Sequence, residues 1–383
     1  MSKQKIKNIE SAAERIKKAI KNNERIILYG DSDLDGISSV VILEEAIKGL
    51  GGHIETAFFP DRENDGYGLN MNALEALKKY SPAILITLDL GIGNINEVDQ
   101  ANKMGFEVII VDHHEPLLGT PKASIIVDPK QRDDSYAFKG LANVGVTYNL
   151  CIELLGKDIS KNLKNSFEEL AALGTVADMV PQVDQNQEII EEGLRSLRNT
   201  FRPALRAFLD ILGKGKVFEE SIGKIISGLN AAESVDFCNE SYTLLVCPDE
   251  KKCKDIAQRL LDKNQHKQSQ VKNIINEVER RISKKMDDPI VFEGDPSWKL
   301  TLAGPVASTI CTKYGKPVFI YKLGSKESCG SVRNPKGTNS VDAMKSCDSF
   351  LMTYGGHAQA SGFRLKNEHI DRFKDCLNKF FKK

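Results

Sequence analysis

Short apolar runs alternate with helical patterns over the first 200 residues of the chain. Runs at 25–30, 83–88 and 108–111 have the length and composition of buried strands. Strands that alternate with helices predict right-handed strand–helix–strand units and a largely parallel sheet. In full, the pattern predicts strands at 25–30, 53–59, 83–89 and 107–112 and helices at 37–50, 70–79, 94–104, 144–155, 167–178 and 188–198.

The pattern changes beyond residue 250. Residues 251–285 are polar and helical in composition with a narrow apolar stripe, which predicts an exposed connecting helix. A second α/β pattern follows, with strands near 289–292 and 317–321 and with frequent glycines. The predicted fold class is therefore α/β in three parts: an N-terminal doubly wound, largely parallel sheet at 1–250, the connecting helix at 251–286 and a smaller C-terminal α/β domain at 287–383.

Composition narrows the class of protein. The chain has 383 residues, 41% hydrophobic and 28% charged, as expected of a globular protein with two or three domains. No apolar run is long enough to cross a membrane, and the polar N-terminus predicts no signal peptide. The eight cysteines include no Cys-x-x-Cys pair, so we expect reduced thiols in a cytoplasmic protein. Because the formal net charge is zero, binding to a polyanion would need a local basic patch.

Acidic and histidine residues directly follow several of the apolar runs. They are Asp31, Asp33, Asp35, Asp89, Asp112, His113, His114 and Asp178. Because the carboxyl ends of parallel strands meet at one edge of a sheet, we expect these side chains to converge. A single Asp at such a position usually caps a helix, but many carboxylates in one place repel one another unless cations lie among them. The set therefore predicts a metal site.

The segment from Asp31 to Gly36 supplies three of these carboxylates. In an extended loop alternate side chains point the same way, so all three can face one point, and Gly36 permits a tight turn into the next helix. Carboxylates mixed with imidazoles suit Mn²⁺, Mg²⁺ or Zn²⁺, and the lack of cysteine favours the first two. A carboxylate between two such ions is an arrangement that activates water for attack on phosphorus.

The motifs resemble those of a known family. Asp31-x-Asp33-x-Asp35-Gly36, Asp89, Asp112-His113-His114 and Asp178 are similar to the four motifs of the DHH phosphoesterase superfamily. Other segments resemble its RecJ-type single-strand exonucleases: Pro60-Asp61-Arg62, Gly66-Tyr67-Gly68-Leu69, Asp128-Pro129-Lys130, Gly174 to Pro181, Ser331-x-Arg333 and Gly355 to Phe363. Tyr29 stands where pyrophosphatase-like and nanoRNase-like members carry a metal-binding histidine, which favours the RecJ branch.

The resemblance implies a site for two Mn²⁺ ions, with Mg²⁺ as an alternative. The implied ligands are Asp33, Asp35, Asp89, His113 and Asp178. Asp89 would bridge the ions, and Asp31 would be either an additional ligand or a nearby acid. His114 would contact the scissile phosphate or the attacking water. The implied catalytic residues are thus His114, Asp89 and Asp31.

The resemblance also implies a substrate-binding surface and its ligand. Residues 287–383 would be the DHH-associated domain, and the implied substrate-binding residues are Ser331, Arg333, Gly355, Gly356, His357, Arg62 and Tyr67. Single strands are usually held by cations on phosphates, close backbone contacts and stacking aromatics, which these residue types can supply. The expected partners are single-stranded DNA or RNA and a replication or repair protein, with no membrane involved.

Three departures from the RecJ pattern weaken the expected hold on long strands. Asn230 to Ser234 lacks the usual arginine, Trp298-Lys299 replaces Trp-His, and Gln187 stands where arginine is common. The chain ends at Lys383, so we also expect no additional oligonucleotide-binding barrel. The leading hypothesis is a metal-dependent exonuclease that releases mononucleotides from single-stranded DNA, RNA or both. The alternatives are an oligoribonuclease or cyclic-dinucleotide phosphodiesterase and, in a different class, a non-catalytic replisome scaffold.

Overall fold

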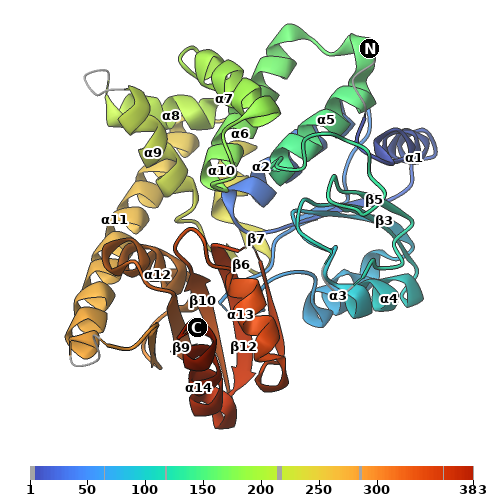
Figure 1. The fold of residues 1–383 in the computed structure, drawn as a ribbon. Helices are drawn as coiled ribbons and strands as arrows, with labels where there is room; N and C mark the ends of the chain where they lie inside the picture. The colour runs from blue at the N-terminus through green and yellow to red at the C-terminus, as the bar shows by residue number, and fades with distance from the viewer. Residues whose placement is uncertain are drawn as a thin grey trace. The chain divides into compact units, whose positions relative to one another are not determined.

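The protein forms two compact units (Figure 1). The computed structural model describes residues 5–63, 65–116, 119–213, 218–283, 287–356 and 358–382. One unit lies within residues 1–264 and the other within residues 265–383. Both units combine a sheet with helices, which confirms the predicted α/β class and the smaller C-terminal part.

The N-terminal unit is built on a parallel sheet of five strands, in the order β2-β1-β3-β4-β5. The strands are β1 (Ile26–Gly30), β2 (Thr56–Phe58), β3 (Ala83–Leu88), β4 (Phe106–Val111) and β5 (Ile125–Val127). Every pairing is parallel, as predicted. The strand order reverses between β1 and β3, and open α/β sheets bind their ligands at the carboxyl ends of strands beside such a switch point.

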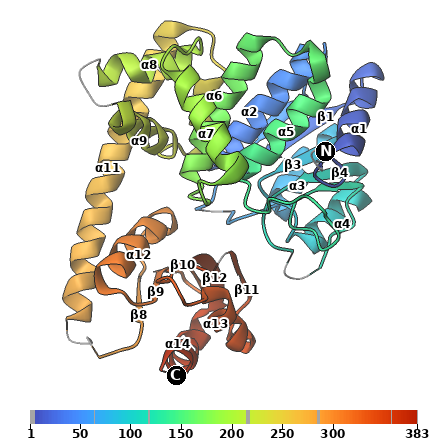
Figure 2. The same cartoon turned by 45° about the horizontal axis from the view of Figure 1, so that its top comes forward.

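Helices cover both faces of this sheet (Figure 2). On one face lie α1 (Ile9–Lys21), α2 (Leu34–Gly49) and α5 (Asn143–Leu155), and on the other lie α3 (Met71–Leu77), a 3₁₀ turn (Lys78–Tyr80) and α4 (Ile95–Lys103). Ile26 and Leu28 belong to the first core, whereas Ile27 and Tyr29 belong to the second. This alternation follows from the two-residue period of a strand, so an unbroken apolar run is what a strand covered on both faces requires.

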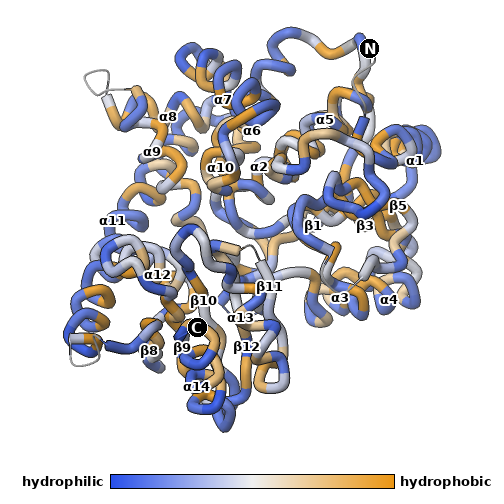
Figure 3. The backbone as a smooth tube through the Cα atoms, in the orientation of Figure 1, coloured by the Kyte–Doolittle hydropathy of each residue, from blue (hydrophilic) through white to orange (hydrophobic). Residues whose placement is uncertain are grey.

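A further helical layer completes the N-terminal unit. It contains α6 (Lys161–Ala177), α7 (Asp184–Leu197), α8 (Pro203–Leu212), α9 (Phe218–Leu229), α10 (Glu240–Leu245) and the two short strands β6 (Ser234–Val235) and β7 (Cys238–Asn239). Helices α6 and α7 pack closely because Gly193 has no side chain: a Cβ atom there would lie 2.0 Å from the carbonyl oxygen of Glu168. The outward turns of α1 and α7 are hydrophilic, as the amphipathic pattern predicts (Figure 3).

The helix α11 (Glu250–Ile282) contains residues of both compact units. Its buried apolar residues fall into two groups. Cys253, Ala257 and Leu260 belong to the core of the N-terminal unit, whereas Val278 and Ile282 belong to a core of the C-terminal unit. The predicted connecting helix is therefore anchored at each end by a different core.

The C-terminal unit contains a mixed sheet in the order β11-β12-β10-β9-β8. Its elements are β8 (Val291–Asp295), α12 (Leu300–Tyr314), β9 (Val318–Leu323), β10 (Glu327–Arg333), α13 (Ser340–Ser346), β11 (Thr353–Gly356), β12 (Ala360–Lys366) and α14 (Ile370–Phe381). Strands β8 and β9 are parallel and the other pairs antiparallel. The parts of α11 and α12 in this unit share a core on one face, and α13 and α14 share a core on the other.

The expectation of eight reduced cysteines is wrong for one pair. Cys347, which follows α13, forms a disulfide with Cys376 of α14, whereas the other six cysteines are free. Packing of α13 against α14 brings the two Cα atoms to 6.0 Å, within the range that a disulfide spans. The two residues are 29 positions apart, and no motif connects them in the sequence.

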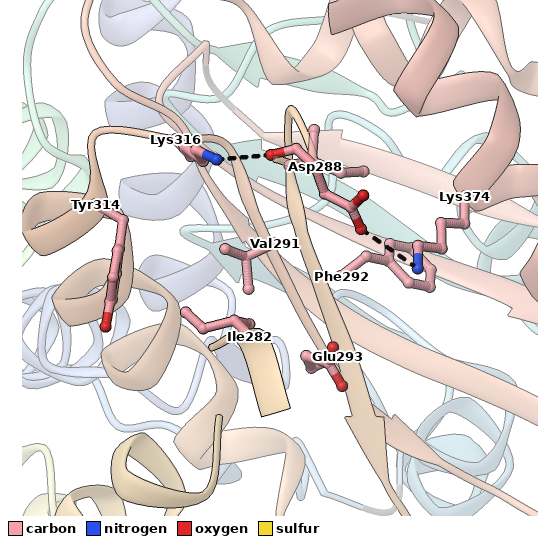
Figure 4. A pocket seen from close by; sticks show the side chains of 9 residues that line it. Ile282, Asp288, Val291, Phe292, Glu293, Tyr314, Lys316 and Lys374 are labelled. Carbon is pink, nitrogen blue, oxygen red and sulfur yellow. Dashed lines mark hydrogen bonds and ion pairs between the residues drawn. The ribbon is translucent and has the colours of Figure 1, made fainter. Parts of the chain in front are cut away.

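Two further features bear on ligands. None of the helices within the described ranges is long and apolar enough to cross a membrane. The C-terminal unit has a small pocket beside β8, with Asp288, Lys316 and Lys374 in its wall (Figure 4). Lys316 Nζ donates to the Asp288 carbonyl oxygen at 2.7 Å, and Lys374 Nζ lies 3.9 Å from the Asp288 carboxylate. Both lysines of the wall thus contact Asp288, one through its backbone and one through its carboxylate.

Candidate metal centre

The carboxyl ends of the parallel strands bring the predicted acidic residues together. Asp31 directly follows β1, Asp89 directly follows β3 and Asp112 directly follows β4. Their backbone N–H groups continue the sheet hydrogen bonding, donating to Leu88 O (3.1 Å), Val111 O (3.0 Å) and Val127 O (3.1 Å), respectively. The ladder therefore fixes these positions side by side, as the sequence pattern predicts for one edge of a parallel sheet.

The segment after β1 differs from the predicted extended loop. Helix α2 begins at Leu34, so Asp33 is its N-cap and Asp35 lies in its first turn. The expectation that all three carboxylates share an extended loop is therefore wrong. The cause is helix capping: the Asp33 side chain accepts a hydrogen bond from Gly36 N at 3.2 Å. Gly36 is needed there because a Cβ atom would lie 2.5 Å from the carbonyl oxygen of Asp31.

The carboxylate of Asp35 is held by the N-terminus of another helix. Backbone N–H groups at the start of α5 donate to its two oxygens, Asn143 N to Oδ2 at 2.8 Å and Val144 N to Oδ1 at 2.6 Å. Free N–H groups and the helix dipole favour a negative charge at this position. Asp178 reaches the same region from the C-terminal end of α6.

His113 lies at the centre of the cluster. Its Nε2 atom is 3.3 Å from Asp89 Oδ1, 3.7 Å from Asp178 Oδ2 and 4.0 Å from Asp35 Oδ2. Its other ring nitrogen, Nδ1, is 2.9 Å from the carbonyl oxygen of Leu141. A carbonyl accepts only, so Nδ1 carries the proton and the Nε2 lone pair is directed at the carboxylates. This orientation is typical of metal-binding histidines.

Three groups of side chains have ligand atoms close enough to share a cation. They are Asp35 with His113 and Asp178, Asp31 with Asp33 and Asp89, and Asp89 with His113 and His114. Within each group the candidate atoms lie within 4.8 Å of one another. Asp89 belongs to two of the groups, which is the position that a bridging ligand would need.

His114 is held on both of its ring nitrogens. Nδ1 is 2.7 Å from Asp112 Oδ1, and Nε2 is 3.0 Å from the hydroxyl of Tyr67. Although burial acts in the opposite direction, the Asp112 carboxylate raises the pKa of His114. The Tyr67 hydroxyl also lies 3.1 Å from the carbonyl oxygen of Asp89. A protonated His114 would donate from Nδ1 to the Asp112 carboxylate and from Nε2 to the Tyr67 oxygen. The Tyr67 hydroxyl would then donate to the Asp89 carbonyl oxygen.

Asp112 is separate from the candidate ligands. Its carboxylate accepts hydrogen bonds from the backbone N–H groups of Ile92 (2.9 Å), His113 (2.7 Å) and His114 (3.2 Å). Although burial opposes the ionised form, the adjacent His114 and these hydrogen bonds lower the pKa of Asp112. Asp112 is therefore a fixed anion that orients His114.

Arg62 lies against the acidic residues after β1. Its Nε atom donates to Asp31 Oδ1 at 2.8 Å, and its Nη2 atom contacts Asp31 Oδ2 and also donates to Asp33 Oδ2 at 2.9 Å. Although burial acts the other way, the Arg62 charge lowers the pKa of Asp33. Both Asp31 oxygens thus contact the guanidinium, so Asp31 holds Arg62 beside Asp33.

The remaining carboxylates lack comparable partners. Burial, together with repulsion among the carboxylates, raises the pKa of Asp35 and Asp89 and raises the pKa of Asp178 to about 7. Asp89 Oδ1 and Asp178 Oδ2 are buried and accept no hydrogen bond from any residue that the structure describes. Buried oxygens without donors are costly unless a cation binds them. Carboxylates with one imidazole nitrogen fit Mn²⁺ or Mg²⁺.

The predicted substrate-binding residues of the C-terminal unit that the structure describes lie on two strands, β10 and β11, which pair with opposite edges of β12. Ser331 and Arg333 alternate on β10, and Ser331 and Gly355 are both paired with Gly362 of β12. Gly356 follows on β11, whereas His357 lies outside the described residues. The structure thus places four of the five predicted residues of this unit on β10 and β11, the two strands that flank β12, and it places Arg62 and Tyr67 at the metal centre of the other unit.

Arg333 is mostly buried and has no acidic partner among the residues that the structure describes. Its Nη1 atom donates to the Val332 carbonyl oxygen at 2.9 Å, and no carboxylate among the described residues forms an ion pair with it. Burial lowers the pKa of Arg333. Gly304 of α12 leaves room for it, since a Cβ atom there would lie 3.2 Å from Arg333 Nη2. An anionic ligand would supply the missing charge.

Sequence reasoning missed one residue that connects the metal-binding strands. Asn143 is fully buried at the start of α5. Its amide, oriented so that both ends are satisfied, donates to Val111 O at 3.0 Å and accepts from Ser39 Oγ (3.0 Å) and Asp89 N (2.8 Å). The available signal was weak: a single polar residue in the otherwise apolar segment 141–146.

The segment 230–234, which differs from the RecJ pattern, also has a structural role. Asn230 Oδ1 accepts a hydrogen bond from Leu34 N at 2.9 Å, and Ser234 Oγ lies 3.3 Å from Ser32 Oγ. This segment therefore supports the Asp31–Asp35 loop, and it places a neutral hydroxyl, not a cation, beside it.

Comparison with known proteins agrees with this site. The DHH family N-terminal domain matches residues 25–175, and the DHHA1 domain matches residues 287–383. The chain therefore contains a DHH family N-terminal domain and a DHHA1 domain, which confirms the resemblance seen in its motifs.

Within this class the similar proteins are RecJ exonucleases. The single-stranded-DNA-specific exonuclease RecJ of Bacillus subtilis (strain 168) is 32% identical over 379 residues, which cover 97% of this chain and 48% of that protein. The chain thus spans about half the length of this relative. The crystal structure of exonuclease RecJ bound to manganese matches with a TM-score of 0.80 and 25% identity, covering 100% of this chain and 96% of that one. RecJ in complex with Mn²⁺ from Thermus thermophilus matches with a TM-score of 0.85 and 25% identity, covering 100% and 55%.

Proposed function

We propose that this protein is a metal-dependent phosphodiesterase, an exonuclease that releases mononucleotides from single-stranded DNA, RNA or both. The observation that carries the proposal is the buried cluster around His113, in which one carboxylate oxygen each of Asp89 and Asp178 accepts no hydrogen bond from the described residues. A scaffold has no physical use for so many unneutralised buried acids, since their pKa values rise at a cost to stability. The names of the relatives and the manganese in two matching structures support the same activity.

We propose Asp33, Asp35, Asp89, His113 and Asp178 as the residues that would hold two Mn²⁺ or Mg²⁺ ions. When bound, such ions supply positive charge and a water of lowered pKa for attack on a phosphodiester. Asp31 would keep Arg62 in place beside them. In this proposal Leu141 O and the α5 N-terminus orient His113 and Asp35 for the same task.

We assign proton handling to His114. Asp112 holds the imidazole through Nδ1 and favours its protonated form. The proton on Nε2, which contacts the Tyr67 hydroxyl in the absence of substrate, is the one that would pass to a phosphate oxygen or water. Arg333, with Ser331 and the backbone of Gly355 and Gly356, would bind a phosphate of the strand. Arginine without a carboxylate partner is well suited to this because it offers paired N–H donors and a permanent charge.

The partners we propose are single-stranded nucleic acid and, as in replication or repair, a protein that delivers it. We also propose a cytoplasmic location, because that is where such strands would be encountered. The substitution of Ser234 for the arginine of the RecJ pattern supports a second candidate, an enzyme for oligoribonucleotides or cyclic dinucleotides that needs fewer phosphate contacts.

A time course on end-labelled single-stranded DNA and RNA oligonucleotides with Mn²⁺ tests these functions. The proposal predicts mononucleotides released progressively from one end by the wild type and none by Asp89→Asn. Cleavage confined to dinucleotides would instead support the second candidate. Intact substrates of every length, despite saturating Mn²⁺, would overturn both.

A further inference from the structure

Met179 is the most exposed of the large apolar side chains in the described part of the chain. Its side chain is 84% exposed, and it directly follows Asp178. It has a φ of +60°, in the left-handed region that glycine and asparagine adopt readily and other residues seldom do. Methionine at this position therefore gains almost nothing from burial and adds backbone strain.

The local fold explains why residue 179 adopts a left-handed conformation, but it does not explain why this residue is a methionine. Helix α6 ends at Ala177, and the Met179 N–H lies 3.4 Å from Val176 O, so the chain turns away from the helix axis at this point. A left-handed residue just past a helix end is usually glycine, which adopts the conformation without cost. Glycine would suit the backbone better, so neither the backbone conformation nor burial accounts for a methionine at this position.

The position of Met179 indicates a use for its side chain. Asp178 Oδ2 is 3.7 Å from His113 Nε2, and consecutive Cα atoms are about 3.8 Å apart, so Met179 borders the cluster. Tyr67, whose hydroxyl contacts His114, is also exposed, at 57%, and its ring is a second apolar surface beside the same cluster. Exposed apolar side chains beside a phosphate-binding site are positioned for the part of a nucleotide that is not phosphate.

We infer that Met179 packs against the nucleoside, through its base, next to the phosphate that is bound at the metal centre. This inference rests on the proposed function. A thioether side chain is flexible and polarisable, so it adapts to the face of any base. It cannot form the hydrogen bonds that read base identity, so the contact contributes to affinity without selecting a sequence.

Three variants separate this role from a structural one. Met179→Gly removes the side chain and relieves the strain, so the protein should melt at the same or a higher temperature while KM for a single strand rises about tenfold, the loss of one base contact. Met179→Leu keeps an apolar side chain and should restore most of the affinity. Val246→Ala removes another exposed apolar group, outside the cluster, and is the control with unchanged KM.

A substrate with an abasic terminal nucleoside identifies the contacted group. On that substrate wild type and Met179→Gly should have the same KM. An unchanged KM for Met179→Gly on the normal strand would overturn the inference, and so would a KM difference that persists without the base.

Failure of the proposed function gives a different result. In that case wild type cleaves neither strand, and calorimetric binding of dAMP and of deoxyribose 5-phosphate in Mn²⁺ replaces the kinetic assay. Tighter binding of dAMP by wild type than by Met179→Gly, with equal binding of the sugar phosphate, supports the contact with the base. Equal binding of dAMP by both proteins overturns it.

Discussion

The two compact units differ in the sign of the charge that they leave without a protein partner. In the N-terminal unit, buried oxygens of Asp89 and Asp178 accept no hydrogen bond from the described residues, and burial raises the pKa of both groups. In the C-terminal unit, the mostly buried Arg333 has no carboxylate partner among the described residues, and burial lowers its pKa. The first needs cations and the second needs an anion.

This difference would allow a chain with zero net charge to bind a polyanion, as proposed above. Each unit keeps one charged site incomplete, while other buried charges, such as Arg202 with Glu45, are paired within the protein. In the proposed function, divalent ions would complete the first site and a phosphate group would complete the second. Such ligands would replace interactions that a purely structural protein makes internally, at the expense of stability in their absence.

The largest effect should come from Asp89→Asn. Asparagine is tolerated at the Asp89 φ of +65° and removes the charge, so the metal-free protein should keep its fold and its melting temperature should not fall. Turnover should fall about 1000-fold or more, and calorimetry should show weaker Mn²⁺ binding. The matched control is Asp99→Asn on α4. Normal turnover in Asp89→Asn would show that activity does not need cations at the buried carboxylates of the N-terminal unit.

Arg333→Ala tests whether the C-terminal unit binds an anion at this arginine. It should raise KM for a single strand about 10- to 100-fold with a smaller change in kcat, because a charge-assisted contact to a phosphate is lost. Arg364→Ala is the matched control, since Arg364 lies on the adjacent strand β12 but is 3.7 Å from Glu327. Equal effects of the two substitutions would show that the missing partner of Arg333 has no bearing on substrate binding.

A smaller effect is expected at Asn143, which supports the metal centre without being a candidate ligand. Asn143→Leu keeps a side chain of similar branched shape that cannot hydrogen-bond with Val111 O, Ser39 Oγ and Asp89 N. We expect Mn²⁺ affinity and kcat to fall about tenfold, in the range found for residues that orient metal ligands. Thr147→Val, one turn along the same helix and also buried, is the control. Unchanged Mn²⁺ affinity, measured by calorimetry, would contradict this role.

The smallest effect concerns pH and stability. Asp128 follows β5, and burial, with the nearby charge of Asp112, raises its pKa to about 8. In the unfolded chain the pKa of an Asp is about 3.9. Between this pKa and the pKa of Asp128 in the folded state, the folded state therefore holds more protons than the unfolded state. The contribution of Asp128 to the free energy of unfolding therefore decreases as the pH rises through this window. The equilibrium constant for unfolding rises by up to about tenfold per pH unit.

Asp128→Asn should abolish that dependence. Relative to wild type, the variant should gain stability from about pH 5 to about pH 8 and gain no more above about pH 9. Urea unfolding midpoints measured across this range check the prediction. A constant difference between the two proteins at every pH would mean that Asp128 does not titrate there.

The predictable parts of the molecule are those with a local sequence signal. The parallel strands follow from apolar runs such as 83–88, and the position of Asp89 follows from the strand that it ends. The start of α2 was misplaced because Asp33 can end a loop or cap a helix, and only tertiary packing decides between them. The contacts of Arg62 with Asp31, of Asn143 with Asp89 and of Cys347 with Cys376 join distant segments and have no local signal.

Asp33 is both the N-cap of α2 and a candidate metal ligand, which has a consequence for how this site could be lost in evolution. Its Oδ1 atom accepts the Gly36 N–H, whereas Oδ2 is the atom directed to Arg62. A lineage that abandoned the chemistry would still need the cap, since an alanine there costs a helix about 1 kcal/mol. Such descendants should carry Asn, Ser or Thr at this position, so an inactive relative would retain a polar residue as a trace of the enzyme it came from.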